Sequence, residues 1–548
     1  MAGSLADDLM SFYHGHEPGG TPGLLPDPYY WWEAGALMGA LVDYWHYTGD
    51  GKWNDVAAQA LLFQVGPNND YMPTNQTRTE GNDDQGFWGM AAMSAAEYKF
   101  PDPPHDSPQW LALAQAVFNT QAARWDTHDC GGGLRWQIFT WNKGYDYKNS
   151  ISQACFFNIA ARLARYTGNS SYADWASKTW DWMENTNLLQ EGTYYVFDGT
   201  HIKNCSEHMP YQWTYNAGAF LLGAAAMYNF SVGTPAEGQW RQRFEGLFNG
   251  TQVFFTGPDK NIMTEVACEP VNLCNVDQQS FKAYLARWMA ASIKWVPWIA
   301  GRAQALLSPS AEAAVSTCRG GDSGRLCGLK WTEHGKWDGT SGVGQQMAAL
   351  QIVMSGLVDM APGPVTQRHG SSRGDPGAGG SDVGRTDPFD LDYGREPATL
   401  AAKAGAALLT LLTLAGLVAG CLFVATDMGE GRDIIIPGDQ TSETRRPDSI
   451  KDDDAAAAAA AVVVQTLEHV AVRDGCGFVG GRPKPRRPKT DGALSDASSS
   501  SSSSSVMGGI YQQPLPYTTD MGEELSSLAL RKKAAQQSRG RPVQLEAK

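Results

Sequence analysis

The sequence predicts an all-α fold, a closed ring of six helix pairs known as an (α/α)6 toroid. Segments of one kind recur at residues 29, 83, 149, 212, 277 and 343, at intervals of 54 to 66 residues. Each segment is a loop of aromatic and polar residues that opens a helix rich in Ala, Gly and bulky apolar residues. Helix pairs at such a regular period indicate a helical toroid or solenoid.

The recurring helices are apolar on all sides, which is expected of inner helices that protein covers on both faces. Between them, residues 53–64, 110–124, 172–185, 238–248 and 297–307 predict more amphipathic outer helices. Six pairs need six outer helices, and these segments supply five. Residues 4–13 can supply the sixth outer helix. We therefore expect a closed ring. An open solenoid is the alternative, and the aromatic loops that all converge at the inner helix starts favour closure.

The composition limits this fold to the first two thirds of the chain. All 19 Trp of the 548 residues lie at or before Trp337, and after residue 362 the sequence turns to Gly, Ser, Ala, Pro and charged residues. Such a composition buries too little apolar surface to offset the entropy lost on folding. The helical domain is therefore assigned to residues 1–362, followed by a disordered linker over residues 363–403.

A membrane segment is predicted after the linker. Residues 404–426 form an uncharged, mainly apolar run between Lys403 and Asp427. As a helix this run reaches roughly 34 Å, enough to cross a hydrocarbon core of about 30 Å. A buried helix of a soluble domain is the alternative, but the low-complexity flanks offer nothing to bury it. We expect a single transmembrane helix at residues 404–426 and a disordered cytosolic tail over residues 427–548.

The cysteines and sequons indicate that the helical domain lies outside the cytosol. Seven of the nine Cys fall in the first part of the chain, and two short spacings, Cys268/Cys274 and Cys318/Cys327, predict loop-closing disulfides. An odd number leaves at least one thiol free or paired with a residue upstream. Five N-x-S/T sequons favour passage through a secretory lumen and are predicted glycosylation sites. They start at Asn75, Asn169, Asn204, Asn229 and Asn249.

These features together predict a single-pass membrane protein of the cell surface or endomembrane system, with the helical domain extracytosolic. The first 15 residues have neither a basic n-region nor an apolar h-region, so they do not resemble a signal peptide. We expect that the true start lies upstream; export through the membrane segment alone is the alternative.

The charge and the cysteine pattern disfavour several classes of function. The net charge of −15 argues against nucleic acid as a partner, because a phosphate-binding surface needs a basic excess. The cysteines show no CxxC pairing and no His at metal spacing, which argues against a zinc site. No metal and no cofactor is expected.

The opening loops of the inner helices meet at one mouth of the ring if these helices run in the same direction. Aromatic faces together with amides and carboxylates suit pyranose rings, whose C–H faces stack on aromatic rings and whose hydroxyls pair with polar groups. For any single aromatic residue, ordinary helix packing is the alternative. The mouth would collect Tyr29, Tyr30, Trp31, Trp32, Asp83, Asp84, Trp88, Tyr145, Tyr147, Asn149, Trp213, Tyr215, Asp277, Gln278 and Trp337.

Asp83 and Asp84 are the candidate catalytic residues. Neighbouring carboxylates repel, so one of them holds its proton more tightly than the other. Acetal hydrolysis needs this division, with one acid to protonate the leaving oxygen and one carboxylate to attack or stabilise the oxocarbenium-like state. Successive residues within a helix point about 100° apart, which turns two neighbouring side chains away from each other. The pair is therefore expected at the helix entrance, where the backbone can direct both side chains at one sugar. Helix capping is the alternative role for Asp at such a position.

Several motifs, in order, resemble those of the glycoside hydrolase family 76 endo-α-1,6-mannosidases, and most closely their fungal cell-wall branch. They are PYYWWEAGALMGALVDYWHYTGD, NDDQGFW, YKNSISQACFFNIAARLARYTGN, QWTYNAG and FKAYLARWM, which span the chain from near its start to about residue 360. The family fold is an (α/α)6 barrel, in agreement with the repeat.

The resemblance implies residue roles on α-1,6-linked mannose. Asp83 would be the nucleophile and Asp84 the general acid/base of a retaining mechanism. The ligand would be α-1,6-mannan, or the glycan of a mannoprotein or GPI anchor. The expected sugar-binding residues are Trp31, Trp32, Gln85, Trp88, Asn149, Trp213, Tyr215 and Asp277.

The sequence leaves three functions open. The first is an endo-acting retaining α-1,6-mannosidase of fungal cell-wall biogenesis. The second is a transglycosylase that uses the same chemistry to link mannan-bearing GPI-anchor glycans to wall glucan. The third is a non-catalytic mannan-binding receptor, which the long tail favours and the intact pair of aspartates disfavours.

Overall fold

The structure is a computed structural model that describes residues 1–333, 335–380, 409–410 and 412–420. The chain divides into two units, and of the described residues 1–333 and 335–380 belong to the first and 409–410 and 412–420 to the second. In the second unit, residues 409–410 and 412–420 are described, and they are helical and exposed. The helical domain of the first unit contains the candidate site.

The domain is built from twelve α-helices within the described residues. Six of them form an inner layer: α2 (Trp31–Thr48), α4 (Asn82–Tyr98), α6 (Ser150–Thr167), α8 (Thr214–Ser231), α10 (Phe281–Ser292) and α12 (Val343–Met354). The other six form an outer layer: α1 (Ala2–Met10), α3 (Asn54–Phe63), α5 (Trp110–Ala123), α7 (Ser170–Asn185), α9 (Glu237–Gly250) and α11 (Ala300–Ser316).

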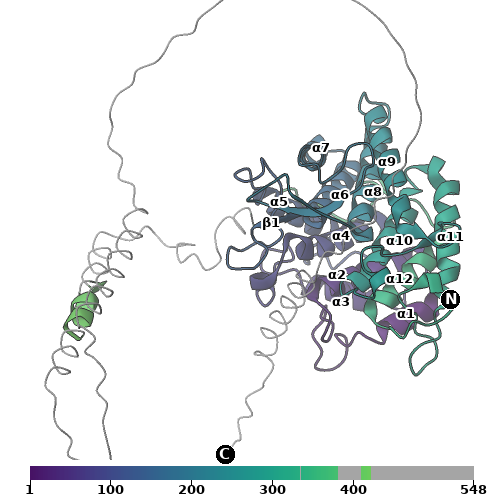
Figure 1. Cartoon of the computed structure of the whole chain (residues 1–548), viewed down its shortest axis with the longest axis horizontal. Coiled ribbons are helices and arrows are strands. Elements are labelled where there is room, and N and C mark those ends of the chain that lie inside the picture. The colour runs from purple at the N-terminus through teal and green to yellow at the C-terminus, as the bar shows by residue number, and fades with distance from the viewer. Residues whose placement is uncertain (334, 381–408, 411, 421–548) are drawn as a thin grey trace, which may run out of the picture. The chain divides into compact units, whose positions relative to one another are not determined.

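The inner helices form a closed ring, as the repeat predicted. Each packs against the next inner helix along the chain, and α12 packs back against α2. Helix α1 contacts both α12 and α2, so it is the outer helix that the sequence assigned to residues 4–13. Figure 1 is a view along the axis of the ring, with the inner helices near the centre and the outer helices around them. An open solenoid is therefore excluded.

Small residues let the inner helices approach closely. A Cβ on Gly35 of α2 would lie 2.7 Å from the indole of Trp88 on α4, and a Cβ on Gly223 of α8 would lie 2.4 Å from the ring of Phe157 on α6. Contacts this short leave no space for a side chain, so each glycine is required by packing. This explains why the inner helices are rich in Gly and Ala.

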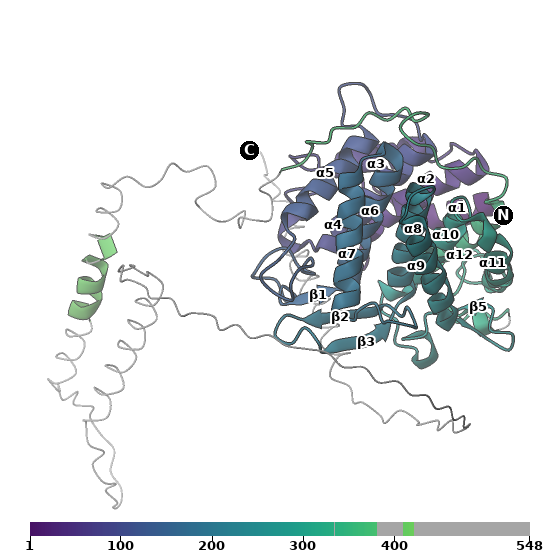
Figure 2. The ribbon, with the colours of Figure 1, turned by 90° about the horizontal axis from the view of Figure 1, so that it is seen from above.

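The domain is mostly helical, as predicted, and its described residues also include five short strands that the sequence did not predict. Strands β1 (Tyr147–Asn149), β2 (Phe197–His201) and β3 (His208–Gln212) form an antiparallel sheet, and β4 (Phe255–Thr256) pairs with β5 (Ile262–Met263). These strands have two to five residues, too few to produce an alternating pattern that sequence reasoning detects. Figure 2 shows the three-stranded sheet at one end of the helix ring. Because β1 leads directly into α6 and β3 precedes α8, this end is the mouth.

The disulfides follow the predicted spacings. Cys268 pairs with Cys274 and Cys318 pairs with Cys327, both within loops. A third bond, Cys130–Cys205, joins loops 75 residues apart. Cys155 on α6 is buried and is the thiol that the odd count left over.

The assignment of residues from 363 onward to a disordered linker was wrong for residues 363–380, which run back along the ring. The Val365 amide donates to the carbonyl of Glu97 at 2.8 Å, and the Gln367 amide donates to that of Tyr166 at 2.9 Å. Farther along, Ser372 Oγ accepts from the Leu111 amide at 2.9 Å. The segment is polar and rich in glycine, yet its backbone groups are paired with the helices. Composition alone does not reveal such pairing.

The remaining sequence predictions for the C-terminal part lie outside the described residues. These are the linker over residues 381–403, the tail over residues 427–548 and most of the membrane segment over residues 404–426. Among the described residues, no helix has both the length and the apolar character needed to cross a membrane.

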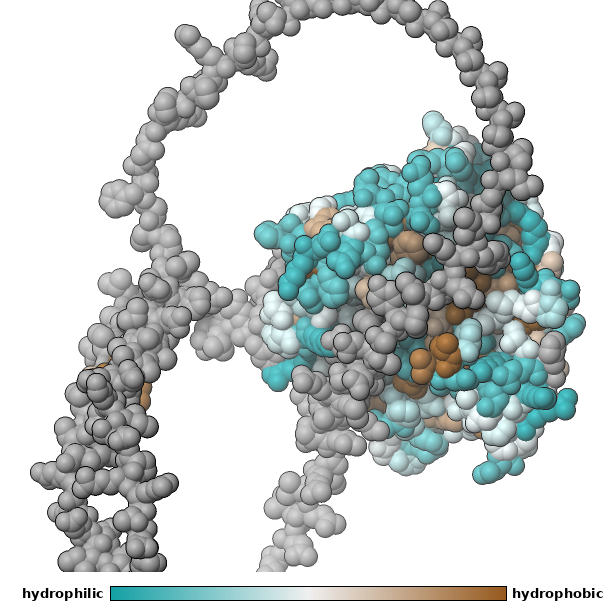
Figure 3. Space-filling model, in the orientation of Figure 1, coloured by the Kyte–Doolittle hydropathy of each residue, from teal (hydrophilic) through white to brown (hydrophobic). Residues whose placement is uncertain are grey.

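The surface of the helical domain is mostly hydrophilic on the face shown in Figure 3, with hydrophobic side chains gathered near its centre. Four of the five sequon asparagines are exposed, namely Asn75, Asn169, Asn204 and Asn249. Asn229 is half-buried, and its Oδ1 accepts a hydrogen bond from Arg165 Nε at 3.0 Å.

Candidate active site

The two aspartates stand in the first turn of α4, at the mouth of the ring. The Gly81 amide donates to Asp84 Oδ2 at 2.7 Å, so Asp84 caps the helix. The Asp84 amide donates to Asp83 Oδ1 at 3.1 Å. Both carboxylates are half-buried. Capping and a catalytic role are therefore compatible here, because the cap fixes the direction in which the Asp84 side chain points.

Asn149 connects Asp83 to the next inner helix. Its Nδ2 donates to Asp83 Oδ2 at 3.0 Å, and its Oδ1 accepts from the Ser152 amide at 3.3 Å as the N-cap of α6. Because the capping bond fixes the orientation of the amide group, the NH2 end must face Asp83. The starts of α4 and α6 thus hold one carboxylate between them.

A short backbone ladder stabilises the same region. The Asn82 amide donates to the carbonyl of Trp136 at 2.9 Å, and the Trp136 amide donates to that of Tyr147 at 2.7 Å. Gly81 and Gln137 also form an antiparallel bridge. The segment of Trp136 therefore lies between the chain that carries Asp83 and the strand that leads to Asn149.

Acidic side chains line the side of the pair that faces α2 and α10. Trp32 Nε1 donates to Asp277 Oδ1 at 3.0 Å. Glu33 has no exposed surface, and burial, followed by the charge of Asp277, raises its pKa well above the usual range. The pKa of Tyr30 is also raised, first by burial and then by the charges of Asp277, Glu33 and Asp84. These groups share one electrostatic neighbourhood of negative charge.

Aromatic and amide groups line the opposite side, near α6 and α8. Asp198 on β2 accepts hydrogen bonds from Tyr147 Oη at 2.6 Å and from Trp213 Nε1 at 2.8 Å. Burial raises the pKa of Asp198, and these two bonds oppose the rise. Tyr215 stacks on Phe281 with ring centroids 3.7 Å apart. A half-buried carboxylate thus fixes two of the aromatic rings.

The structure brings together most of the predicted site residues. Asp83 and Asp84 lie beside Asn149. Trp32 and Asp277 form one wall, and Trp213 lies with Tyr215 against Phe281 on the other.

Three predicted sugar-binding residues lie within the core. Gln85 has no exposed surface, and its Nε2 donates to the carbonyl of Asp70 at 2.7 Å. Trp88 is also fully buried, and it stacks on Trp31 with ring centroids 5.2 Å apart. Trp31 Nε1 donates to Gln64 Oε1 at 2.9 Å. Trp88 follows Asp84 by four residues, so it lies one turn deeper in the ring and on the same helix face.

The sequence reasoning did not identify three residues beside the site. Asp198 belongs to a short strand that was not predicted. Trp136 lies in the loop between α5 and β1, too far before the start of α6 to belong to the segment that opens that helix. Glu33 is the third helical residue of α2 and accepts from the Tyr30 amide at 2.9 Å, as Asp84 does from Gly81 at 2.7 Å. This repeated capping geometry is a signal that an alignment of the internal repeats can detect.

The arrangement supplies two adjacent carboxylates with different surroundings, which is what acid- and nucleophile-assisted cleavage of an acetal requires. Asp83 receives a hydrogen bond from a neutral amide, and Asp84 lies close enough to the buried Glu80 for its charge to raise the Glu80 pKa. Within the part of the chain that the structure describes, no group of three or more His, Cys, Asp or Glu side chains could hold a metal ion.

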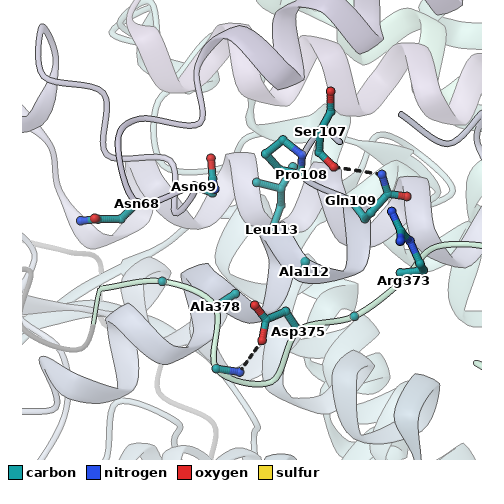
Figure 4. A pocket seen from close by; sticks show the side chains of 13 residues that line it. Asn68, Asn69, Ser107, Pro108, Gln109, Ala112, Leu113, Arg373, Asp375 and Ala378 are labelled. Atoms are coloured by element: carbon teal, nitrogen blue, oxygen red, sulfur yellow. Dashed lines mark hydrogen bonds between the residues drawn. The ribbon is translucent and has the colours of Figure 1, made fainter. Parts of the chain in front are cut away.

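Cavities of the described domain include one apart from the carboxylate pair and one next to it, which Asn82 and Tyr145 help to line. One of about 520 Å³ lies between residues 68–69, the start of α5 and residues 373–379, as Figure 4 shows, and no predicted site residue lines it. A second of about 310 Å³ is lined by Asn82, Arg124, Arg135, Gln137 and other residues of the loops around α4 and α5. The first cavity lies apart from the carboxylate pair and is not a candidate for the chemistry described above.

Comparison with known proteins identifies relatives across the whole helical domain. The model of glycosyl hydrolase family 76 matches residues 1–368. The mannan endo-1,6-alpha-mannosidase DCW1 of Saccharomyces cerevisiae is 47% identical over 422 residues, which cover 77% of this chain and 91% of that protein. The DFG5 protein of the same yeast, also named a mannan endo-1,6-alpha-mannosidase, is 41% identical and covers 76% of this chain and 89% of its own.

Solved structures agree with this comparison. Dfg5 from Chaetomium thermophilum, solved in complex with glucosamine, is 47% identical, has a TM-score of 0.67 and covers 70% of this chain and 96% of that one. An α-1,6-mannanase of Salegentibacter sp. HEL1_6, solved as an inactive variant with two consecutive aspartates replaced, is 16% identical and has a TM-score of 0.52. It covers 65% of this chain and 99% of its own, and it shares the fold. The chain therefore belongs to glycosyl hydrolase family 76.

Proposed function

We propose that the protein is an endo-acting, retaining α-1,6-mannosidase that hydrolyses internal linkages of mannan in fungal cell-wall biogenesis. The observation that carries the proposal is the pair Asp83 and Asp84, held at the mouth of the ring by the cap of α4 and by Asn149. Relatives named mannan endo-1,6-alpha-mannosidases support the choice of linkage and sugar. Trp32, Trp213 and Tyr215 supply the aromatic surfaces that pyranose rings need.

The surroundings of the two carboxylates support separate roles. The hydrogen bond from Asn149 favours the ionised form of Asp83, which suits a nucleophile. Asp84 interacts electrostatically with Glu80, a buried residue whose pKa is raised by burial and then by the Asp84 charge. Asp84 therefore stands next to a buried carboxyl group with a raised pKa, a setting unlike that of Asp83, and we assign it the role of general acid/base.

The proposed reaction proceeds in two steps. A carboxylate oxygen of Asp83 forms a bond to the anomeric carbon while the bond from that carbon to the leaving oxygen breaks, and Asp84 gives its proton to that oxygen. In the second step Asp84 takes a proton from water, the water oxygen bonds to the anomeric carbon and the bond to Asp83 breaks. The configuration at the anomeric carbon is retained.

A transglycosylase is the second candidate, because a sugar hydroxyl can replace water in the second step. Two observations favour it. The Chaetomium thermophilum relative was solved with glucosamine, an amino sugar. The Asp277 carboxylate, whose charge raises the pKa of Tyr30 as that of Asp84 does, complements a sugar ammonium group.

Product analysis distinguishes these functions. The purified domain is incubated with α-1,6-mannooligosaccharides, alone and with a β-glucan oligosaccharide as acceptor. Shorter free mannooligosaccharides that retain the α configuration support the mannosidase, and elongated or mixed products support the transglycosylase. Binding without any product contradicts both and supports a receptor.

We also propose that the domain is extracytosolic on a single-pass membrane protein of the cell surface or endomembrane system. Three disulfides and four exposed sequon asparagines support this proposal. In sealed microsomes from a fungal host that expresses the full chain, the domain is expected to resist added protease until detergent is present, and to lose mass on treatment with an endoglycosidase. Digestion without detergent would contradict the proposal.

A further inference from the structure

Trp136 is a tryptophan beside the carboxylate pair that neither the repeat nor the predicted motifs include. It lies in the loop between α5 and β1, and it is half-buried, whereas most tryptophans of the domain are buried. Its backbone is bonded on one side to the start of α4, through Asn82, and on the other to Tyr147 of β1. The side chain is therefore attached to a rigid position within the mouth rather than to a free loop.

Two glycines show where the indole lies. A Cβ on Gly81 would be 2.2 Å from Asp83 Oδ1 and 3.2 Å from Cδ1 of Trp136, so the pyrrole edge of the indole and the Asp83 carboxylate are near neighbours. A Cβ on Gly144 would be 2.4 Å from Cε3 and 2.7 Å from Cζ3 of Trp136, so the benzene ring of the indole rests on Gly144. Gly144 has a φ of 99°, a conformation that glycine adopts without strain.

We propose that Trp136 is a substrate-binding residue whose indole stacks on a hexopyranose ring of the glycan directly beside the sugar attacked by Asp83. This inference rests on the proposed function and adds a contact on the Asp83 side of the site. The wall on the other side of the pair consists of Trp32 with acidic groups, so the two sides differ in chemistry. The Trp136 side presents an aromatic ring and the Asn149 amide, which suit a neutral sugar.

In this proposal Gly144 is a positioning residue, because it leaves the space in which the Trp136 indole lies. Because the indole occupies the space that a Cβ at position 144 would need, a side chain there must displace the ring. The position of the stacking surface thus depends on a residue that does not itself contact the sugar.

The test is a comparison of steady-state kinetics on α-1,6-mannotetraose. Trp136→Ala is expected to raise KM about tenfold with kcat changed less than about twofold, because stacking contributes equally to ground-state and transition-state binding. Trp136→Phe is expected to restore most of the affinity, since a smaller aromatic face remains. Gly144→Ala is expected to raise KM in the same direction although Trp136 is intact.

Trp141→Ala serves as the matched control. Trp141 lies in the same loop, is 45% exposed and stacks on Phe139 with ring centroids 4.8 Å apart, so its loss is expected to leave KM unchanged. Melting temperatures of all variants show whether each one folds.

The outcomes separate this inference from the proposed function. Unchanged KM in Trp136→Ala, or a fall in kcat alone that Trp136→Phe does not rescue, would overturn the stacking role while wild-type turnover still supports a mannosidase. A wild-type domain without turnover or transfer of mannooligosaccharides contradicts the proposed function, and the inference falls with it.

Discussion

Asp83→Asn and Asp84→Asn are each expected to lower the turnover of α-1,6-mannan by roughly 10³-fold or more, since one removes the proposed nucleophile and the other the proposed proton donor. The amide is close in size to the carboxylate but neither attacks carbon nor donates a proton of comparable acidity. Initial rates with a purified polysaccharide, measured from the reducing ends released, check this prediction.

The folded state should survive both substitutions. In Asp84→Asn the side-chain oxygen can still accept from the Gly81 amide, which is the capping bond of α4 at 2.7 Å. In Asp83→Asn the side-chain oxygen can still accept from Asn149. Asp55→Asn is the matched control, because Asp55 also occupies the first turn of a helix but is exposed on the outer helix α3. Unchanged activity in either active-site variant would contradict the catalytic assignment.

An activated substrate separates the two roles. An aryl α-mannoside with an acidic phenol as its leaving group does not need protonation of the departing oxygen. The Asp84 variant is therefore expected to release the phenol in a burst and then slow, because removal of the sugar from Asp83 still needs a base. The Asp83 variant should release none. The reverse pattern would show that Asp84 is the nucleophile and Asp83 the general acid/base.

The helix ring could be predicted from sequence because its signal is repeated. Each inner helix shows the same composition at nearly the same interval, so the evidence accumulates over six copies, and the closing helix α1 follows from counting. The candidate catalytic pair could be placed because it lies at the start of one such helix. Trp31, Gln85 and Trp88 lie in the core instead, because a linear motif does not show how deep in the ring, or on which side of a helix, each of its positions lies.

The rest of the site depends on contacts that have no local signature. Asp198 on β2 meets Tyr147 and Trp213 only because β2 pairs with β1 on one side and, with an irregular register, with β3 on the other. Residues 363–380 are ordered by hydrogen bonds to helices that lie far away in the sequence, such as the bond from Val365 to Glu97. Neither contact leaves a periodic pattern along the chain, and periodicity is the evidence on which the sequence predictions rested.

The ring itself depends on a buried ion pair at the end opposite the mouth. Arg162 on α6 and Glu97 on α4 are each 1% exposed. Arg162 Nε and Nη2 donate to Glu97 Oε2 at 2.9 and 2.7 Å. The guanidinium also donates to Asn158 Oδ1 at 3.2 Å and to Ser94 Oγ at 2.9 Å. One side chain therefore satisfies polar groups on two neighbouring inner helices.

Arg162→Leu is expected to lower the free energy of unfolding by about 3–5 kcal/mol, because it leaves the Glu97 carboxylate buried with only the more distant Arg165 to balance it. A lower midpoint of urea-induced unfolding measures the loss. Lys52→Ala is the control: it breaks an ion pair with Asp7 in which both side chains are about half exposed, and such pairs contribute about 1 kcal/mol or less.

A second substitution tests the physical cause. If the cost arises from the stranded carboxylate, Glu97→Leu added to Arg162→Leu should restore part of the lost stability, since two apolar side chains then fill the space without a buried charge. Because the pair lies at the C-terminal ends of α4 and α6, kcat/KM of the folded variants should match the wild type at low temperature. A double variant no more stable than Arg162→Leu alone would show that the stranded carboxylate is not the cause of the loss.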